Sequence, residues 1–222
     1  EFVLPLLSEG AHLEVASAND LWVVKKLWLG ENFHSKIRVL CNGPKTQPYI
    51  DLIKQLREKG LAIVPIIEDI SELKLFNGGY NGELGIRINL QSKVKSHWDK
   101  KIDRFGLMLN EILELGKIKN LKILHYHIGS QIERENDILL ALREAFNAYK
   151  KIRANNPTLD TINIGGGFAV PYEKKRMYSV ESVMRRIFKT LRDLSKKAGI
   201  PHPNVIVEWG RYITAPAQLT VY

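Results

Sequence analysis

Leu124-His125-Tyr126-His127-Ile128-Gly129-Ser130-Gln131 is the stretch of this chain that says most about its fold. Apolar residues surround the two histidines, and a Gly-Ser turn follows at once. A short apolar run that ends in a turn is typical of a buried strand. The pattern therefore predicts a strand over 122–128 whose carboxyl end carries His127 and the Ser130 hydroxyl.

Two further predicted strands end in equally unusual residues. The run 161–164 leads into Gly165-Gly166-Gly167, and the run 205–207 leads into Glu208-Trp209-Gly210-Arg211. Glycines allow backbone N–H groups to converge on an anion, and a buried carboxylate requires a partner. A stacking imidazole, a glycine loop and a carboxylate beside a guanidinium would form a cradle for a phosphorylated, protonated ring.

Short apolar runs alternate with helical patterns along the whole chain. Strands are predicted near 12–16, 37–41, 61–67, 84–89, 122–128, 161–165 and 204–208. Helices are predicted near 19–28, 46–58, 69–76, 105–115, 136–153 and 179–198. Strict alternation of this kind predicts parallel strands covered by helices.

The fold class that we favour is α/β, a (β/α)8 barrel of the TIM type that lacks its first strand. An open doubly wound sheet could also use seven strands. In a barrel, functional residues gather at the carboxyl ends of the strands, and every predicted strand here ends in polar residues or glycines. These are Glu14, Asn42, Glu68, Arg87, His127, Gly165 to Gly167 and Glu208.

The composition is that of an ordinary globular protein with a basic balance. The chain has 222 residues, of which 45% are hydrophobic, and a formal net charge of +9. Much of the excess lies between 174 and 197, where the spacing favours a solvated outer helix over a polyanion-binding surface. The single Cys41 suits a reducing, cytoplasmic compartment. No apolar run approaches the ~20 residues that span a bilayer, and no zinc-finger or RNA-binding motif is present, so we expect neither membrane nor nucleic-acid partners.

Each candidate residue also has a purely structural interpretation. His127 could be a satisfied core histidine, and His125 should face the same side of the strand. A zinc pair of the two lacks a third ligand at a recognisable spacing, so we expect no metal site there. Glu208 could pair with Arg211 rather than with a ring nitrogen, and Arg87 could form a buried ion pair. The triple glycine could be a mere turn.

The chain resembles the fold-type III pyridoxal-phosphate enzymes, the alanine-racemase-like barrels that include ornithine, diaminopimelate and arginine decarboxylases. The resemblance rests on five segments in order. They are Leu13-Glu14-Val15-Ala16-Ser17, Val39-Leu40-Cys41-Asn42-Gly43-Pro44-Lys45, His125-Tyr126-His127-Ile128-Gly129-Ser130-Gln131, Asn163-Ile164-Gly165-Gly166-Gly167 and Glu208-Trp209-Gly210-Arg211. The second and third segments are most similar to those of the biosynthetic arginine decarboxylases.

The resemblance implies a role for each residue at a matching position. His127 would stack on the ring of pyridoxal 5′-phosphate, and Glu208 would face the pyridine nitrogen. The residues that would contact the phosphate are Ser130, Gly166, Gly167, Gly210 and Arg211. Glu14 and Arg87 would line the site. Trp209 stands where the family often has proline.

The activity implied by the resemblance is pyridoxal-phosphate-dependent decarboxylation of a basic amino acid, with L-arginine giving agmatine and carbon dioxide in polyamine biosynthesis. Mg²⁺ could assist, as a divalent metal does in some arginine decarboxylases. The alternatives are a diaminopimelate decarboxylase, a non-catalytic regulatory relative, and a phosphate-binding barrel with another chemistry.

Two features of the family have no counterpart in this sequence. The family's Schiff-base lysine lies on the first barrel strand, and no lysine here matches that motif. The family's C-terminal β-domain, which completes the active site across a dimer, is also not matched. We therefore expect residues 1–222 to be the cofactor-binding barrel domain, strands 2 to 8, of a longer enzyme that forms a homodimer or higher homo-oligomer. This piece alone should be inactive.

Overall fold

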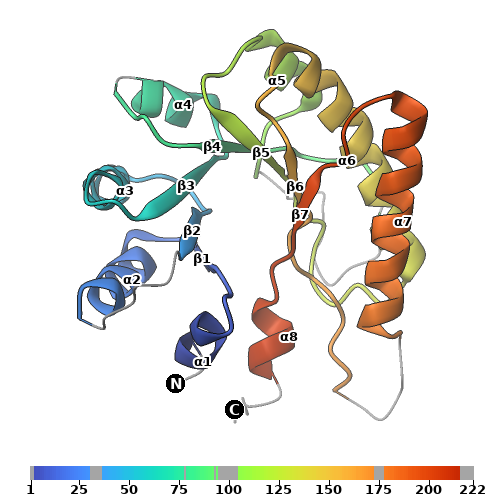
Figure 1. The fold of residues 1–222 in the computed structure, drawn as a ribbon, viewed down its shortest axis with the longest axis horizontal. Helices are drawn as coiled ribbons and strands as arrows, with labels where there is room; N and C mark the ends of the chain where they lie inside the picture. The colour runs from blue at the N-terminus through green and yellow to red at the C-terminus, as the bar shows by residue number, and fades with distance from the viewer. Residues whose placement is uncertain are drawn as a thin grey trace.

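Seven parallel strands form one curled sheet in the computed structural model of the chain (Figure 1). The structure describes residues 3–30, 37–77, 79–92, 94, 105–172 and 178–215. The strands, which pair in chain order, are β1 (Leu13–Val15), β2 (Arg38–Cys41), β3 (Ala62–Ile67), β4 (Leu84–Arg87), β5 (Leu121–His125), β6 (Thr161–Asn163) and β7 (Asn204–Ile206). Within the described ranges neither β1 nor β7 pairs with a further strand, so the predicted barrel with one strand fewer than eight is confirmed.

Eight helices accompany this sheet in the described part of the chain. They are α1 (Val3–Ser8), α2 (Ala18–Gly30), α3 (Gln47–Glu58), α4 (Ile70–Asn77), α5 (Leu109–Glu114), α6 (Glu135–Asn155), α7 (Val180–Ala198) and α8 (Gly210–Thr214). Figure 1 shows α2 to α7 covering the outer, convex face of the sheet. Six of these helices were predicted, whereas α1 and α8, of six and five residues, were not.

Two layers of side chains lie on the inner face of the sheet: an apolar layer, and a polar layer nearer the carboxyl ends of the strands. The apolar layer forms a small cluster of its own, separate from the core beneath the helices: Leu40, Val64, Ile66, Ile123 and Ile206. Because side chains alternate between the two faces of a strand, residues two positions further on face the same side. Those residues are Asn42, Glu68, His125 and Glu208.

Strand register adds three more residues to the polar layer. Arg87 and His125 are partners in register between β4 and β5, and His125 and Asn163 are partners between β5 and β6. Glu14 on β1 is in register with Leu40. Each of the seven strands therefore places a polar residue on the inner face at or near its carboxyl end.

Several predicted boundaries differ from those in the structure, among them the ends of β4 and β6, which lie two residues earlier than predicted. β5 ends at His125, so His127 lies in the following loop rather than on the strand beside His125 as predicted. α5 begins at residue 109 rather than near 105, because Gly106 has a φ of 83° and Leu107 bridges to the end of β4. β7 ends at Ile206, two residues before Glu208.

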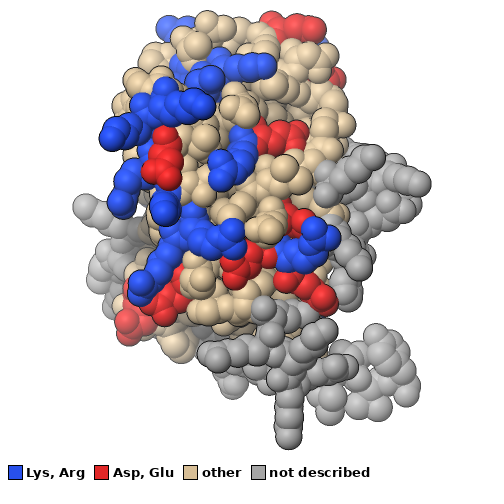
Figure 2. Space-filling model, turned by 90° about the vertical axis from the view of Figure 1, so that its right-hand side faces the viewer, with Lys and Arg blue, Asp and Glu red and all other residues tan. Residues whose placement is uncertain are grey.

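The basic helix α7 is solvated on its polar side, as the sequence predicts. Its apolar residues Val183, Ile187 and Leu191 are buried. Its exposed cations are Arg185, Arg186, Lys189, Arg192, Lys196 and Lys197. Figure 2 shows Lys and Arg side chains gathered on the face over this part of the molecule, with Asp and Glu between them. The cations predicted at 174–176 lie outside the described residues.

Over the described ranges, no helix is both long and apolar enough to cross a membrane.

Two leucines on α6 test the packing of the helices on the sheet. Leu142 is fully buried, whereas Leu140 on the same helix is 49% exposed. We expect Leu142→Ala to lower the free energy of unfolding by about 2–5 kcal/mol, because it removes buried apolar contacts and leaves a cavity. Leu140→Ala should change it by less than about 0.5 kcal/mol. Urea denaturation of both variants measures the difference, and equal losses would contradict this packing.

Candidate active site

Two amide groups from other strands hold the carboxylate of Glu208. Its Oε1 accepts hydrogen bonds from Asn42 Nδ2 at 3.0 Å and from Asn163 Nδ2 at 2.9 Å. Its second oxygen, Oε2, accepts no hydrogen bond from any described residue. The side chain is 16% exposed. The orientation of the carboxylate is therefore fixed at one oxygen, while the other can accept a hydrogen bond from a ligand.

Arg211 contacts a serine and a tyrosine rather than Glu208. Its Nε donates to Ser130 Oγ at 3.0 Å, and its Nη1 donates to the Tyr172 hydroxyl at 2.9 Å. The structural alternative in which Arg211 neutralises Glu208 is therefore wrong. The guanidinium and the Ser130 hydroxyl lie together, as expected for two groups that bind one phosphate.

The glycine loop after β6 packs against backbone that leaves no room for side chains. A Cβ on Gly167 would lie 2.1 Å from the Gly129 carbonyl oxygen, and one on Gly166 would lie 2.7 Å from the Glu208 carbonyl oxygen. Gly167 also has a φ of 89°, which only glycine adopts without strain. The three glycines thus bring the loop against both Gly129, next to Ser130, and the chain at Glu208.

His127 borders the same loop. Its Nδ1 accepts a hydrogen bond from the Gly166 N–H at 3.2 Å. The ring is half-buried, and it lies between the end of β5 and the glycine loop. His127 is therefore next to the loop with its edge fixed, as required of a ring that stacks on a ligand.

His125 lies deeper, beside Glu208. It is 1% exposed, and its Nε2 is 3.5 Å from Glu208 Oε1. Burial, followed by the charge of Arg87, lowers the pKa of His125 well below its usual value. The imidazole is therefore neutral at physiological pH.

Arg87 forms a buried ion pair within the polar layer. Its Nη1 is 3.2 Å from Glu68 Oε2, and its guanidinium also lies over the Phe105 ring at 5.0 Å. The other Glu68 oxygen accepts the Gly43 N–H at 2.7 Å. Of the two interpretations of Arg87, the structure supports the ion pair, and the pair stands at the margin of the proposed site.

A second buried pair lies next to the first. Lys45 Nζ is 3.7 Å from Glu72 Oε2 and donates to the carbonyls of Gly43 and Ile66. Glu72 in turn accepts the backbone N–H groups of Lys45 and Glu68. Burial lowers the pKa of Lys45, and the nearby carboxylates oppose that change. This network fixes the turns after β2 and β3 that carry Asn42 and Glu68.

Glu14 lies on the edge strand β1, where the residue as a whole is exposed but its carboxyl group lies near Asn42 and Glu208. Desolvation of its carboxyl group, followed by the negative charge of Glu208, raises the pKa of Glu14 to about 7. Glu14 therefore holds its proton more readily than an ordinary glutamate and limits the negative charge around Glu208.

Three residues of this arrangement were not assigned a role from the sequence. Asn42 and Asn163 hold Glu208, and Tyr172 contacts Arg211. Asn163 stands two residues before the glycine loop, in an apolar strand. A polar amide at such a position indicates that it has a specific partner, since buried polar groups are hydrogen-bonded. Tyr172 leaves no such signal, because its contact depends on how two loops meet.

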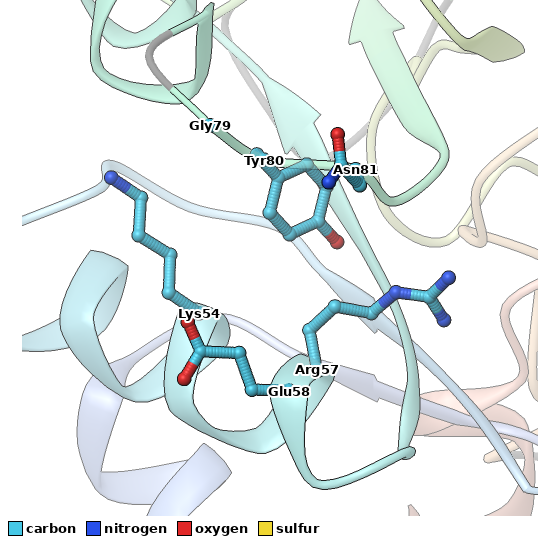
Figure 3. Close-up of a pocket in the computed structure, with 6 residues that line it drawn as sticks. All are labelled: Lys54, Arg57, Glu58, Gly79, Tyr80 and Asn81. Carbon is cyan, nitrogen blue, oxygen red and sulfur yellow. The ribbon is translucent and has the colours of Figure 1, made fainter.

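A pocket of about 510 Å³ lies at the opposite edge of the sheet (Figure 3). It is lined by Lys54, Arg57 and Glu58 at the end of α3 and by Gly79, Tyr80 and Asn81 before β4. These positions precede β3 and β4 in the chain, so the pocket is at the amino ends of the strands. Lys54 and Tyr80 already donate to backbone carbonyls there. The groups suited to chemistry gather instead at the carboxyl ends.

A curled parallel sheet of this kind, with polar groups at the carboxyl ends of its strands and a glycine loop beside serine and arginine, is typical of barrels that bind phosphorylated ligands. A family model described as "Pyridoxal-dependent decarboxylase, pyridoxal binding domain" matches residues 2–215. The chain belongs to this family.

Similar proteins agree with this assignment. The chain is 33% identical over 233 residues to the biosynthetic arginine decarboxylase of Bacteroides thetaiotaomicron, covering 95% of this chain but 36% of that protein. The crystal structure of the biosynthetic arginine decarboxylase from Campylobacter jejuni superposes with a TM-score of 0.75 at 24% identity, over 94% of this chain and 36% of that one. Diaminopimelate decarboxylase from M. jannaschii in complex with L-lysine gives a TM-score of 0.74 at 22% identity, over 91% and 49%. The two structures support the fold.

Alanine substitutions at two glycines can distinguish the stability cost of steric contact from that of an unfavourable φ. Gly167 and Gly199 both have positive φ, but a Cβ would meet the Gly129 backbone only at position 167. We expect Gly199→Ala to cost about 1 kcal/mol of stability and Gly167→Ala to cost more, about 3 kcal/mol, because the loop must move. Thermal unfolding of the two variants provides the measurement. Equal losses would mean that the loop has room at position 167.

The pKa of Glu14 predicts how stability depends on pH. Because the folded protein holds this proton up to about pH 7 whereas the unfolded chain releases it near pH 4.5, Glu14 destabilises the fold as pH rises between these values. Glu14→Gln removes this contribution. We expect the variant to gain stability over the parent protein as pH increases from 5 to 8, by denaturant unfolding at each pH. Parallel curves for the two proteins would refute the raised pKa.

Proposed function

We propose that this chain is the cofactor-binding barrel of a pyridoxal-phosphate-dependent decarboxylase of basic amino acids, and that the protein converts L-arginine to agmatine and carbon dioxide. The observation that carries the proposal is the carboxylate of Glu208. One of its oxygens is held by two asparagines and the other accepts no hydrogen bond from the described residues, beside a glycine loop and the Ser130–Arg211 pair.

The proposed cofactor contacts divide into a buried end and an exposed end. At the buried end, Glu208 Oε2 would accept the N–H of the pyridinium ring. At the exposed end, the proposed phosphate ligands are Ser130, Gly166, Gly167, Gly210 and Arg211. His127, fixed by the Gly166 N–H, would lie against the ring between the two ends. Glu14 and Arg87 would line the margin.

When bound, the cofactor supplies an electron sink for the pair left on the α-carbon as carbon dioxide departs. The contribution of this chain is to keep the ring nitrogen protonated. Glu208 serves this purpose because a carboxylate next to a protonated nitrogen stabilises the proton on it. Asn42 and Asn163 hold the carboxylate in place through hydrogen bonds to its Oε1.

Lys45 does not serve as a covalent anchor for the cofactor in this proposal. Its Nζ is fully buried and donates to two backbone carbonyls. Release of that amine would break the network that positions Asn42. We therefore assign Lys45 a structural role.

The choice of L-arginine as substrate follows from the relatives named as biosynthetic arginine decarboxylases. The chain spans about a third of the length of that relative, 36%. Diaminopimelate decarboxylation is the second candidate, favoured by a solved structure of comparable similarity. Release of labelled carbon dioxide from carboxyl-labelled arginine, ornithine, lysine and diaminopimelate by the full-length protein distinguishes the two. Cofactor binding without release from any of them would favour a regulatory relative.

Two further parts of the proposal concern assembly and surroundings. We propose that the protein forms a homodimer or higher homo-oligomer in the cytoplasm, where the single buried Cys41 stays reduced. Light scattering tests the oligomeric state. In the described part of the chain, no three His, Cys, Asp or Glu side chains lie so that they could hold a metal ion.

Glu208→Gln tests the central contact with little change of shape. We expect carbon dioxide release to fall at least a hundredfold, which is within the usual range for a group that controls a proton in the reaction. Glu58→Gln, at an exposed position beside the pocket at the amino ends of the strands, should leave the rate unchanged. A Glu208→Gln protein with more than a tenth of the parent rate would contradict the assignment of Glu208.

A further inference from the structure

His125 is a buried polar residue that the protein does not satisfy. The side chain is fully enclosed, and neither Nδ1 nor Nε2 has a hydrogen-bond partner among the described residues. Buried polar side chains nearly always have such a partner, so each exception requires an explanation. An apolar residue of similar size would fill this space without leaving two nitrogens unpaired.

Two strand registers fix the position of this imidazole. His125 is paired with Arg87 on one side and with Asn163 on the other. Asn163 cannot move freely, because its Oδ1 accepts the Gly165 N–H at 2.9 Å while its Nδ2 donates to Glu208. Arg87 is held in turn by Glu68. The imidazole is therefore enclosed between two anchored neighbours and faces Glu208.

The distance between His125 and Glu208 is slightly longer than a hydrogen bond. Nε2 lies 3.5 Å from Oε1, about 0.5 Å beyond the usual N···O separation. Oε1 is the oxygen that the two asparagines hold, and Oε2 is the oxygen that no described residue occupies. His125 therefore stands behind the carboxylate, on the side away from a ligand at Oε2.

We infer that His125 is a positioning residue for Glu208: its Nε2–H supports Oε1 and thereby directs Oε2 at the N–H of a protonated pyridine ring. This inference rests on the proposed function.

The charge state of the imidazole suits this role. The charged and titratable groups around it are Arg87, His127, Lys45 and Glu208, and burial together with the nearby cations keeps the ring neutral. The dipole of a neutral N–H can face Oε1 without cancelling the negative charge of Glu208. A protonated imidazole would repel the pyridinium cation and compete with it for the same carboxylate. The low dielectric of the site strengthens even a long contact of this kind.

The competing interpretation is that His125 merely fills the core. The two interpretations predict opposite effects of His125→Leu. A space-filling histidine would lose stability on replacement and leave ligand binding intact. If His125 is a positioning residue, its two buried nitrogens without hydrogen bonds lower the stability of the ligand-free protein. Replacement by leucine should then keep or raise that stability.

The test measures binding of pyridoxine 5′-phosphate to the full-length protein by calorimetry. This ligand lacks the aldehyde, so it forms no covalent bond with a lysine and reports the ring and phosphate contacts alone. Benzyl phosphate, a phosphorylated ring without a nitrogen, reports the phosphate contacts. The variants are His125→Leu, His125→Gln, which retains a donor, and Ile123→Val, a buried control on the same face of β5.

We expect His125→Leu to weaken pyridoxine 5′-phosphate binding about tenfold, which is less than the loss of a full hydrogen bond to a charged group, because the Nε2···Oε1 contact is longer than one. Benzyl phosphate binding should change less than threefold. His125→Gln should recover most of the loss, and Ile123→Val should bind both ligands as the parent does. The melting temperature of ligand-free His125→Leu should be no lower than that of the parent.

Each contrary result has a separate meaning. If the parent binds pyridoxine 5′-phosphate and His125→Leu binds it equally well, the positioning role is wrong and the proposed function stands. If His125→Leu loses both ligands to the same extent, the change has distorted the cradle, and the specific link to Glu208 is wrong. If the parent does not bind pyridoxine 5′-phosphate, the proposed function is wrong and this inference fails with it.

Discussion

The structure of this site depends on the two-residue period of a β-strand. Alternate side chains of a strand face opposite sides of the sheet. The residue two positions after an inward-facing apolar residue therefore also faces inward, and here it falls at or just beyond the end of the strand. Ile123 is followed in this way by His125, and Ile206 by Glu208. Seven parallel strands in register repeat this placement, so the polar ends form one layer. A shift of one residue in any strand would exchange its polar residue for an apolar one from the core beneath the helices.

Buried charges in and beside this polar layer would destabilise the fold if they had no partner, and most of them form ion pairs. Arg87 is compensated by Glu68, and Lys45 by Glu72. Glu208 receives two amide donors in place of a cation, so its negative charge is stabilised without being cancelled. Glu68 and Glu72, which are paired with cations, therefore have structural roles, whereas Glu208 is suited to bind a ligand. A buried carboxylate that already has an arginine has little reason to bind a second cation, whereas Glu208 has one oxygen still open. The raised pKa of Glu14 keeps a further negative charge from accumulating next to it.

The sequence predicted the elements well and their contacts poorly. All seven strands were found, because short apolar runs between helical patterns are a local signal, and the polar ends of the strands were recognised as a group. The partners of those polar ends were not, because they depend on residues far apart in the chain: Asn42 and Glu208 are separated by 166 positions. A small error in the predicted end of β5 also changed the predicted orientation of two histidines. With β5 extended to 128, His125 and His127 were placed on one face of a strand, whereas the strand ends at His125 and the two rings have different surroundings. The roles of the individual phosphate and ring contacts remain predictions.

The unsatisfied polar atoms of the structure are not scattered through the core. Five buried side-chain atoms in the described ranges have no partner, and three of them belong to Asn42 and His125, the neighbours of Glu208. The glycines of the 165–167 loop, where a Cβ would clash with neighbouring backbone, lie against the same region. A sequence selected only for stability would replace such groups, since apolar side chains would pack in their place at no cost in hydrogen bonds. Their concentration around one carboxylate indicates that this end of the barrel is arranged for a ligand, with the orientation of Glu208 fixed before the ligand arrives. A site prepared in this way loses less entropy on binding than one that must assemble around its ligand, and that advantage offsets the stability lost at Asn42 and His125.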